Sequence, residues 1–483
     1  MATQSTSKSA TKSTQQPRLK AVLVGVQLQR VSDEETKASL QELKRLVDTL
    51  GYEVIGSLSQ KRSGLGGAVV IGEGKLKELA RWTGGPGTVQ PMVQAKKSKA
   101  AERFGKTEAD DFDEEEDFTS TEIEEPEAEG FEGGPPVGVR ADVVVFDNEL
   151  TPSQMRNLES ATGAQVLDRT GVIIEIFSRH ARTRAAQLQV EIARLNYLAP
   201  RLRETGGGGD RQGGGIGGKG AGETSQELDR RRIRDRVKEL KRDLEAVQQE
   251  HSVRRARRSG ENTVALVGYT NAGKSSLMRA MTGSEILVAD KLFATLETTV
   301  RPLHPETMPK VLLSDTVGFI KKLPHDLVAS FRSTLDEALN ANLLLYVVDS
   351  ADPTFRSQLE VTKTVLAEIG ANETPSWLIL NKRDRLTDFE VAGLREEFPD
   401  AIQISTRDPQ DLAKLREALI GFFEGEMVEE TILVPYQVQG AIGEIRAQMR
   451  VLSEDYDNHG TTLRVRAKPE ALARLKRRFE GLE

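Results

Sequence analysis

The stretch TVALVGYTNAGKSS, residues Thr263 to Ser276, decides the fold of the central part of this chain of 483 residues. Its first five residues are apolar or β-branched and predict a short buried strand, and a helical pattern follows Lys274. Between them, Gly268 to Ser275 has the spacing of a phosphate-binding loop, with the strand and the helix that this loop needs on either side. Its backbone N–H groups and the helix N-terminus would point at phosphate oxygens. We therefore predict a P-loop domain between about Glu261 and Glu426.

A second apolar strand, Lys310 to Leu313, leads into the segment SDTVG, which ends at Gly318. In a site of this type Lys274 neutralises the β- and γ-phosphates, and the hydroxyl of Ser275 binds Mg²⁺. Asp315 would hold the Mg²⁺ shell through water, and the N–H of Gly318 would reach the γ-phosphate. The two segments together predict a site for a nucleoside triphosphate and its magnesium ion.

The identity of the base is predicted from a third strand, Trp377 to Leu380, which ends in the segment NKRD at Asp384. A carboxylate there can accept two hydrogen bonds from guanine, from N1–H and the 2-amino group. Adenine has no matching donors and would leave Asp384 unpaired, a penalty of about 1–3 kcal/mol or more. After a further short strand, 401–404, Ser405 and Thr406 stand where backbone N–H groups would meet the guanine carbonyl. The chain is therefore predicted to bind GTP and GDP rather than ATP.

A nucleotide switch of this kind needs a threonine whose hydroxyl completes the Mg²⁺ shell when the γ-phosphate is present. Three candidates lie between the phosphate-binding loop and Asp315, namely Thr295, Thr298 and Thr299. Their spacing alone does not choose among them.

The residue after Gly318 is informative because it is not the glutamine that commonly orients the attacking water. It is Phe319, which cannot polarise water. We therefore expect slow basal hydrolysis, with the water organised by another group or by a partner that accelerates the reaction.

Composition limits the other possibilities. Hydrophobic residues make up 37% of the chain and charged residues 29%, and there is no cysteine. The missing cysteine excludes disulfides, iron–sulfur clusters and thiolate zinc sites. The chain contains no run of about 18 consecutive apolar residues, which is the length needed to span a membrane. Its five histidines lack the spacing of a metal site. We expect a cytoplasmic protein.

Strand and helix patterns predict an α/β fold with several domains. The predicted parts are a disordered tail, 1–18; an N-terminal α/β domain, 19–178, with a disordered acidic insertion, 84–138; a helical hairpin, 179–258, with a glycine-rich loop, 205–222; a P-loop domain with a parallel sheet, 259–428; and a small C-terminal α/β domain, 429–483.

The elements expected outside the P-loop domain follow the same patterns. Strands are expected at 19–27, 52–58, 67–71, 142–146, 431–434 and 460–465. Helices are expected at 32–50, 75–82, 152–162, 225–258, 440–452 and 469–479, with one long helical stretch over 171–202.

The net charge of −7 is unevenly distributed. Residues 108–132 contain acids but no Lys or Arg, whereas 229–258 is rich in Arg. The arginines could contact RNA phosphates or form a solvated helix face. The glycine-rich loop could be an idle flexible linker or a loop that probes RNA. The acidic segment could mask the basic face or serve as a solvating tether.

These residues together resemble the HflX family of ribosome-associated GTPases. Outside the P-loop domain the similarity is carried by DNELTP ending at Pro152, RTG ending at Gly171 and SRHARTR ending at Arg184, and it covers most of 140–440. Two features depart from the family: this chain has GETSQE, 222–227, where the family usually has GETQLE, and the acidic insertion is not a family feature.

The resemblance implies that Thr295 is the Mg²⁺-binding switch threonine and that Lys274, Thr295 and Gly318 are the catalytic residues. It implies Mg²⁺ ligands at Ser275, Thr295 and Asp315. The nucleotide-contacting residues expected are Gly268, Tyr269, Thr270, Asn271, Ala272, Gly273, Lys274, Ser275, Ser276, Phe293, Ala294, Thr295, Leu296, Glu297, Asp315, Thr316, Val317, Gly318, Asn381, Lys382, Asp384, Ser405, Thr406 and Arg407.

The resemblance also implies a partner, the large ribosomal subunit and its rRNA, with no DNA partner and a monomeric chain in the cytoplasm or on the ribosome. Ribosome splitting and rescue, or subunit biogenesis, is the role expected of a GTP-hydrolysing switch of this family. The alternative is an RNA-binding assembly factor in which nucleotide turnover is secondary. The C-terminal domain could bind a ribosomal protein or pack on the GTPase domain.

Overall fold

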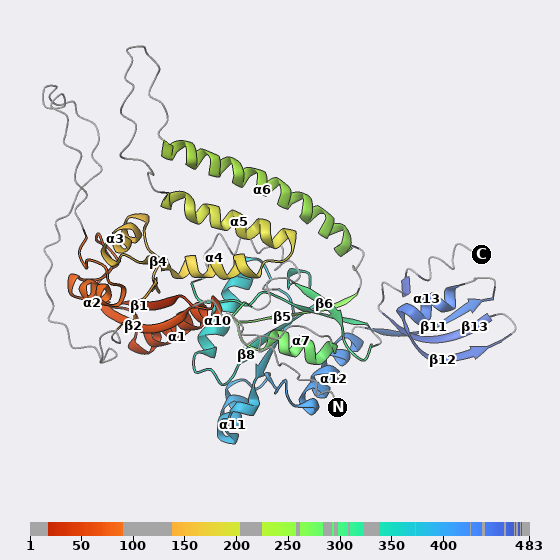
Figure 1. Cartoon of the computed structure of the whole chain (residues 1–483). Coiled ribbons are helices and arrows are strands. Elements are labelled where there is room, and N and C mark those ends of the chain that lie inside the picture. Colours follow the sequence, from red (N-terminus) through yellow and green to blue (C-terminus); the bar gives the residue numbers. More distant parts are fainter. Residues whose placement is uncertain are drawn as a thin grey trace, which may run out of the picture. The chain divides into compact units, whose positions relative to one another are not determined.

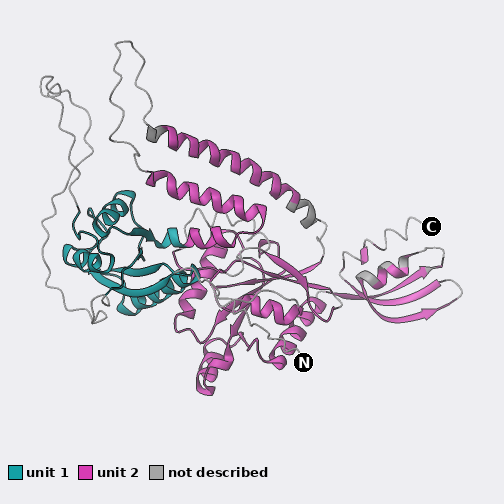
Figure 2. Ribbon diagram, viewed as in Figure 1, with its two compact units in different colours: residues 1–172 teal, residues 173–483 magenta. Residues whose placement is uncertain are grey.

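The computed structural model describes residues 18–89, 138–202, 225–256, 261–283, 292–293, 298–307, 310–322, 338–371, 373–425, 427–436, 440–457 and 460–467, together with 469, 472, 473 and 475. The chain divides into two compact units, residues 1–172 and 173–483 (Figure 2). No helix within the described residues is both long and apolar enough to cross a membrane.

The first unit contains a four-stranded parallel sheet in the order β2-β1-β3-β4 (Figure 1). Its strands are β1 (Lys20–Leu28), β2 (Glu53–Arg62), β3 (Val143–Phe146) and β4 (Gln165–Asp168). Its helices are α1 (Asp33–Thr49), α2 (Glu73–Thr83) and α3 (Pro152–Thr162). Ser32 and Thr151 start α1 and α3 through capping boxes, which satisfy backbone N–H groups that the first turn leaves unpaired.

A buried ion-pair network lies at the carboxyl end of this sheet. Arg169 is 1% exposed. One of its Nη atoms donates to Asp147 at 2.6 Å and to the hydroxyl of Ser39, and the other donates to Glu42. A buried guanidinium needs acidic partners that match its charge. These partners lie in α1 and directly after β3, so the network connects both elements to Arg169, the first residue of the following helix.

Three expectations for this unit need correction. Residues 67–71 form bends rather than a strand, because Gly67 adopts φ +102° and its carbonyl and those of its neighbours accept bonds from side chains of α3. Strand β4 was not expected. Residues 84–89, expected in a disordered insertion, pack on the end of α3, where a β-carbon at Gly85 would lie 2.2 Å from the carbonyl carbon of Thr162. Residues 90–137 lie outside the described residues.

The helical stretch expected over 171–202 is two helices, α4 (Arg169–His180) and α5 (Arg184–Leu198), followed by a short 3-10 turn (Ala199–Arg201). The break falls at Thr183, which is extended and whose hydroxyl accepts the N–H of Ala186 to start a new helix. Helix α5 packs against α6 (Ser225–Ala256) through Leu188, Ile192 and Leu240 (Figure 1). The glycine-rich loop expected between these helices lies outside the described residues.

The P-loop domain is built on a six-stranded sheet in the order β10-β9-β8-β5-β7-β6. Its strands are β5 (Asn262–Val267), β6 (Thr299–Pro302), β7 (Val311–Asp315), β8 (Leu343–Asp349), β9 (Ser376–Asn381) and β10 (Ile402–Gln403). All neighbours pair in parallel except the edge strand β6, which runs antiparallel to β7. The expected parallel sheet is therefore mixed at one edge, because β6 and β7 follow each other directly and can pair as a hairpin.

Helices cover both faces of this sheet. On one face α7 (Lys274–Thr282) and α12 (Pro409–Gly425) share a core with β5, β7 and alternate residues of β8. On the other face α10 (Phe355–Glu368) and α11 (Asp388–Glu397) pack on Val348 of β8 and Leu380 of β9. The sheet is buried on both sides, which explains why its strands read as continuous apolar runs.

The C-terminal part contains a three-stranded antiparallel sheet in the order β11-β13-β12. Its elements are β11 (Val428–Pro435), α13 (Ala441–Gln448), β12 (Arg450–Tyr456) and β13 (Gly460–Ala467). The helix expected over 440–452 ends at Gln448, and Arg450 begins a strand, because Val451 and its neighbours pair with β13. Leu472 and Leu475 complete the core. The predicted α/β fold with several domains is confirmed.

The ion-pair network predicts a large effect of Arg169→Met. This change leaves the buried Asp147 and the partly buried Glu42 without their cation, and we expect a loss of about 3–5 kcal/mol from the free energy of local unfolding. Amide hydrogen exchange in β1 and β3 of the full chain would measure it. Arg179→Met on the same helix α4 is the matched control, because its ion pair with Glu175 is 44% exposed on the arginine side and should contribute about 0–1 kcal/mol. Equal exchange rates in the two variants would contradict this account.

Candidate functional site

The segments that the sequence singled out meet at one edge of the six-stranded sheet. The phosphate-binding loop follows β5, Asp315 ends β7, and Asn381 ends β9. The carboxyl ends of parallel strands face the same edge, where ligands of such sheets bind. The order of the sheet places β5 between β7 and β8, so the loop lies at its centre.

Two glycines of the loop are required by close approaches. Gly268 has φ +150°, and a β-carbon there would lie 2.1 Å from the carbonyl oxygen of Val347. Gly273 has φ +97°, and a β-carbon there would lie 2.3 Å from Nδ2 of Asn381. A side chain at either position would collide with a neighbouring strand, so only glycine fits.

Lys274 is buried and its ammonium group faces the loop. Its Nζ donates to the carbonyl oxygens of Gly268 at 3.0 Å and Tyr269 at 2.7 Å. Burial lowers the pKa of Lys274 to about 8, against the opposing attraction of Asp315. A buried cation held by loop carbonyls is suited to phosphate oxygens, which would compensate its charge.

Ser275 and Asp315 form a pair of oxygen donors beside this lysine. The Ser275 hydroxyl donates to Oδ2 of Asp315 at 2.7 Å, and Asp315 is fully buried. Thr316 is held in place because its hydroxyl donates to the carbonyl oxygen of Leu266 at 2.7 Å. A hydroxyl and a carboxylate next to a phosphate site fit the oxygen ligands that Mg²⁺ prefers.

Gly318 and Phe319 lie directly on the phosphate-binding loop. The N–H of Phe319 donates to the carbonyl of Gly268, and the N–H of Thr270 donates to the carbonyl of Phe319. The phenol oxygen of Tyr269 accepts the N–H of Lys321 at 2.6 Å. Phe319 itself is buried, so its side chain packs in the interior and presents no polar group to the site.

The predicted base-recognition segments are connected to the loop and to each other. Asn381 donates through Nδ2 to the carbonyl of Ala272 at 2.9 Å. Lys382, with φ +64°, donates to the carbonyl of Asn271 at 2.8 Å. The Ser405 hydroxyl donates to Oδ1 of Asp384 at 2.7 Å. This bond places the segment after β10 against the carboxylate predicted to read guanine.

The predicted switch is described only in part. Phe293 is buried, adopts φ +58°, and packs against Phe177 of α4 with ring centroids 4.5 Å apart. Ala294, Thr295, Leu296 and Glu297 lie outside the described residues. Of the other threonine candidates, Thr299 is the first residue of β6.

The remaining predicted contact residues lie around the same edge of the sheet. Ser276 is half-buried in the first turn of α7, and Val317 is buried beside Gly318. Thr406 is half-buried, and Arg407 is exposed with its guanidinium 3.5 Å from Asp384.

Sequence reasoning missed three residues that shape this site. Asp349 ends β8 and accepts from Lys382 at 2.7 Å. Asp411 is buried, accepts the N–H of Ser405 and pairs with Arg383. Phe177 contacts Phe293. Only Asp349 carried a signal, because it ends an apolar strand as Asp315 does.

Comparison with known proteins agrees with this arrangement. Three family models match: "GTP-binding GTPase N-terminal" over 37–89 and 137–178, "GTP-binding GTPase Middle Region" over 180–258, and "50S ribosome-binding GTPase" over 263–382. GTPase HflX of Gluconacetobacter diazotrophicus is 59% identical over 460 residues, covering 95% of this chain and 97% of that protein. GTPase HflX of Escherichia coli is 41% identical over 332 residues, covering 68% and 78%.

Among solved structures, a GTP-binding protein from Sulfolobus solfataricus in complex with GDP is 21% identical, with a TM-score of 0.41, covering 84% of this chain and 100% of that one.

The mixed sheet with a glycine-rich loop after its central strand, together with the match to the "50S ribosome-binding GTPase" model and the GTPase HflX relatives, defines a GTPase of the P-loop class. The two GTPase HflX relatives cover 95% and 68% of this chain at 59% and 41% identity, and this similarity decides its family. The chain belongs to the GTPase HflX family.

The lowered pKa of Lys274 predicts a pH dependence of nucleotide affinity. Because a phosphate beside the ammonium raises its pKa again, nucleotide binding takes up a proton whenever the pH exceeds about 8. GDP affinity should therefore be level between the second pKa of its terminal phosphate, about 6, and that pH, and it should fall as the pH rises further, by up to about tenfold per pH unit. Titration calorimetry over a pH series would measure this. Guanosine, which lacks phosphates, controls for titration of the base, and an equal slope for both ligands would contradict the role of Lys274.

Proposed function

We propose that this chain binds GTP and GDP at the edge formed by β5, β7 and β9, and hydrolyses GTP to GDP and phosphate. The observation that carries the proposal is the direct bonding between the parts of the site. Asn381 and Lys382, which belong to the same segment as the base-reading Asp384, donate to carbonyls of the loop predicted to hold the phosphates. One nucleotide can therefore contact both parts at once.

In this proposal the loop from Gly268 to Ser275 surrounds the phosphates, and Lys274 exchanges its two carbonyl partners for phosphate oxygens. Asp384 accepts from guanine N1–H and the 2-amino group, while its bond to Ser405 fixes the orientation of the carboxylate. Ser276, Thr316, Val317, Thr406 and Arg407 line the same site.

Magnesium would be held by Ser275 and Asp315, and by Thr295 as the family resemblance implies. The bond between Ser275 and Asp315 keeps both oxygens at one spot beside Lys274. When bound, the ion would neutralise charge on the β- and γ-phosphates. Phe293 and its contact with Phe177 would constrain the backbone two residues before Thr295.

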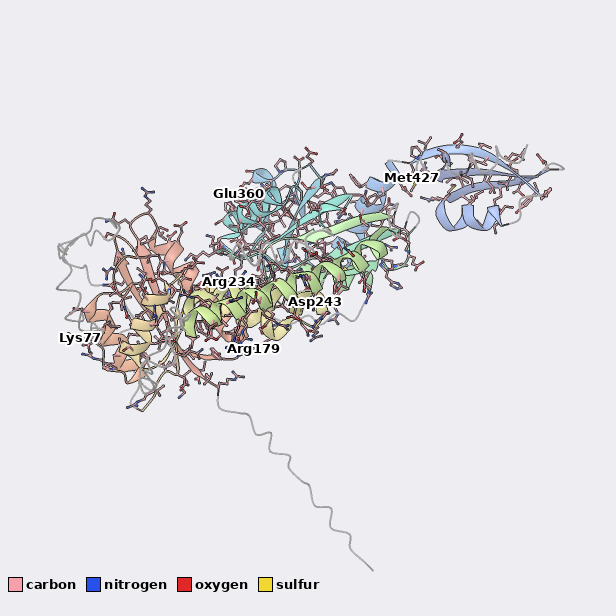
Figure 3. All side chains as sticks on the ribbon, turned by 90° about the horizontal axis from the view of Figure 1, so that it is seen from above. Lys77, Arg179, Arg234, Asp243, Glu360 and Met427 are labelled. Atoms are coloured by element: carbon pink, nitrogen blue, oxygen red, sulfur yellow. The ribbon has the colours of Figure 1, made fainter. Side chains whose placement is uncertain are left out.

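We further propose that the chain associates with the large ribosomal subunit, in ribosome splitting and rescue or in subunit biogenesis, with slow basal hydrolysis that the subunit stimulates. Exposed arginines on α6 support an RNA-facing surface: Arg230, Arg231, Arg232, Arg234 and Arg236. Arg234 and Asp243 lie along this helix (Figure 3). Some arginines pair with acids on the same helix, as Arg232 does with Asp229, and such exposed pairs are weak enough for phosphates to replace. The buried Phe319 supports the need for stimulation.

Base selectivity gives the first test. Asp384→Asn replaces an acceptor with an amide that presents a donor, and we expect GTP affinity to fall by roughly tenfold to a hundredfold. Xanthosine triphosphate, which has a carbonyl in place of the 2-amino group, should bind the variant better than the unchanged chain. Competition against a fluorescent nucleotide would measure both affinities. Asp388→Asn, in the first turn of α11, is the matched control and should alter neither affinity. Unchanged GTP binding by Asp384→Asn would contradict the assignment of the base site.

Ribosome association gives the second test. GTP hydrolysis by the full chain should rise markedly when large ribosomal subunits are added, and ATP should not substitute for GTP. Shortening the segment 206–222 should remove the stimulation while leaving GTP binding intact. If subunits bind the chain equally with GTP, GDP or no nucleotide and do not alter hydrolysis, the RNA-binding assembly factor becomes the better description.

A further inference from the structure

The hydroxyl of Thr270 is a buried polar group that has no hydrogen-bond partner within the described ranges of the chain. Thr270 is the third residue of the phosphate-binding loop and is 7% exposed, and its Oγ1 is shielded from solvent. Buried hydroxyl groups are almost always paired, because an unpaired one costs free energy. Such a group points to a ligand that supplies the missing partner.

The neighbouring hydroxyl groups of the site behave differently. Four of them have a partner at 2.6 to 3.3 Å: those of Tyr269, Ser275, Ser314 and Thr316 bond to the N–H of Lys321, to Asp315, and to the carbonyls of Val264 and Leu266, respectively. Among these five hydroxyl groups, only that of Thr270 has no partner within the described residues, although the carboxamide oxygen of Asn381 is also buried without one.

The position of Thr270 is set by its backbone and by Gly318. Its N–H donates to the carbonyl of Phe319 at 2.8 Å. A β-carbon at Gly318 would lie 2.9 Å from Cα and Cγ2 of Thr270, and 3.0 Å from Nζ of Lys274. The Thr270 side chain and the Lys274 ammonium thus lie against the same side of Gly318. Lys274 and Gly318 are the residues that the sequence predicts to contact the γ-phosphate.

We propose that the Thr270 hydroxyl is a catalytic group for GTP hydrolysis, which donates a hydrogen bond to a γ-phosphate oxygen and accepts one from the attacking water. The inference rests on the proposed function of this site. It assigns a polar group to the task that Phe319, buried and apolar, cannot perform. A hydroxyl group can donate and accept at the same time, as this role requires.

The reaction needs no co-reactant besides water. The water oxygen forms a bond to the γ-phosphorus, and the bond from that phosphorus to the β–γ bridging oxygen breaks, leaving its electron pair on GDP. One proton of the water passes to a γ-phosphate oxygen, so the products are GDP and inorganic phosphate. Thr270 keeps its own proton and acts by orientation and by its hydrogen bond to the developing charge.

Thr270→Val tests the proposal, because valine keeps the branched shape and the methyl contact with Gly318 but lacks the hydroxyl. We expect kcat for GTP to fall on the order of a hundredfold, while GDP affinity stays unchanged, since GDP lacks the γ-phosphate. Thr270→Ser retains the hydroxyl and should keep most of the activity. In the protein without nucleotide, Thr270→Val should raise the midpoint of thermal unfolding, because it removes an unpaired buried hydroxyl.

Thr362→Val is the matched control. Thr362 is a buried threonine of α10 whose hydroxyl is paired with the carbonyl of Gln358 at 2.9 Å, and its loss should leave hydrolysis unchanged. Hydrolysis by Thr270→Val at the rate of the unchanged chain would overturn the proposal, and so would a serine variant as slow as the valine variant. Failure of the unchanged chain to hydrolyse GTP, with large ribosomal subunits present, would instead overturn the proposed function and this inference with it.

Discussion

Asn381 lies within hydrogen-bond distance of the carbonyl of Ala272, and it also occupies the space that a side chain at residue 273 would need. This single approach fixes several properties of the site. It requires glycine at 273, and it sets the distance between the phosphate-binding loop and the end of β9. The close approach of Gly268 to the carbonyl of Val347 likewise requires glycine at 268 and sets the distance between the loop and β8. Because both contacts involve backbone or a short side chain, the loop has little freedom to relax around a substitution.

Most polar groups of the site are already bonded to one another. Lys274 bonds loop carbonyls, Ser275 bonds Asp315, and Ser405 bonds Asp384. A nucleotide must therefore replace existing hydrogen bonds, and only the difference between the new and the old bonds contributes to affinity. Thr270 is an exception to this rule, since its hydroxyl has no partner to exchange among the residues that the structure describes. A contact made by that group adds to binding or catalysis without an opposing loss.

The sequence predicts the parts of this protein in which chemistry and local geometry coincide. The spacing from Gly268 to Ser275 could be read because the loop requires glycines and a lysine at fixed positions. Strand β4 was not predicted and residues 67–71 were wrongly predicted as a strand, because both depend on tertiary contacts: β4 pairs with β3, and the run around Gly67 is held by amide side chains of α3. Asp411 and Phe177 are similar cases. Nothing in the residues near them indicates that a distant segment uses their side chains.

Helix α4 shows how a short element can carry two constraints. Its first residue, Arg169, belongs to the buried ion-pair network, and Phe177, two turns later, packs on Phe293. The residues between them rise by only about 12 Å along a rigid helix. Because packed side chains and helices have few alternative arrangements, a displacement of Phe293 must be absorbed either by its contact with Phe177 or by the helix that carries it. A bulky residue keeps a positive φ only where its surroundings hold it, and Phe293 has φ +58°. Breaking its contact with Phe177 is therefore the costly way to absorb the displacement. Phe293, which directly precedes the predicted switch residues, is thus constrained by its contact with α4.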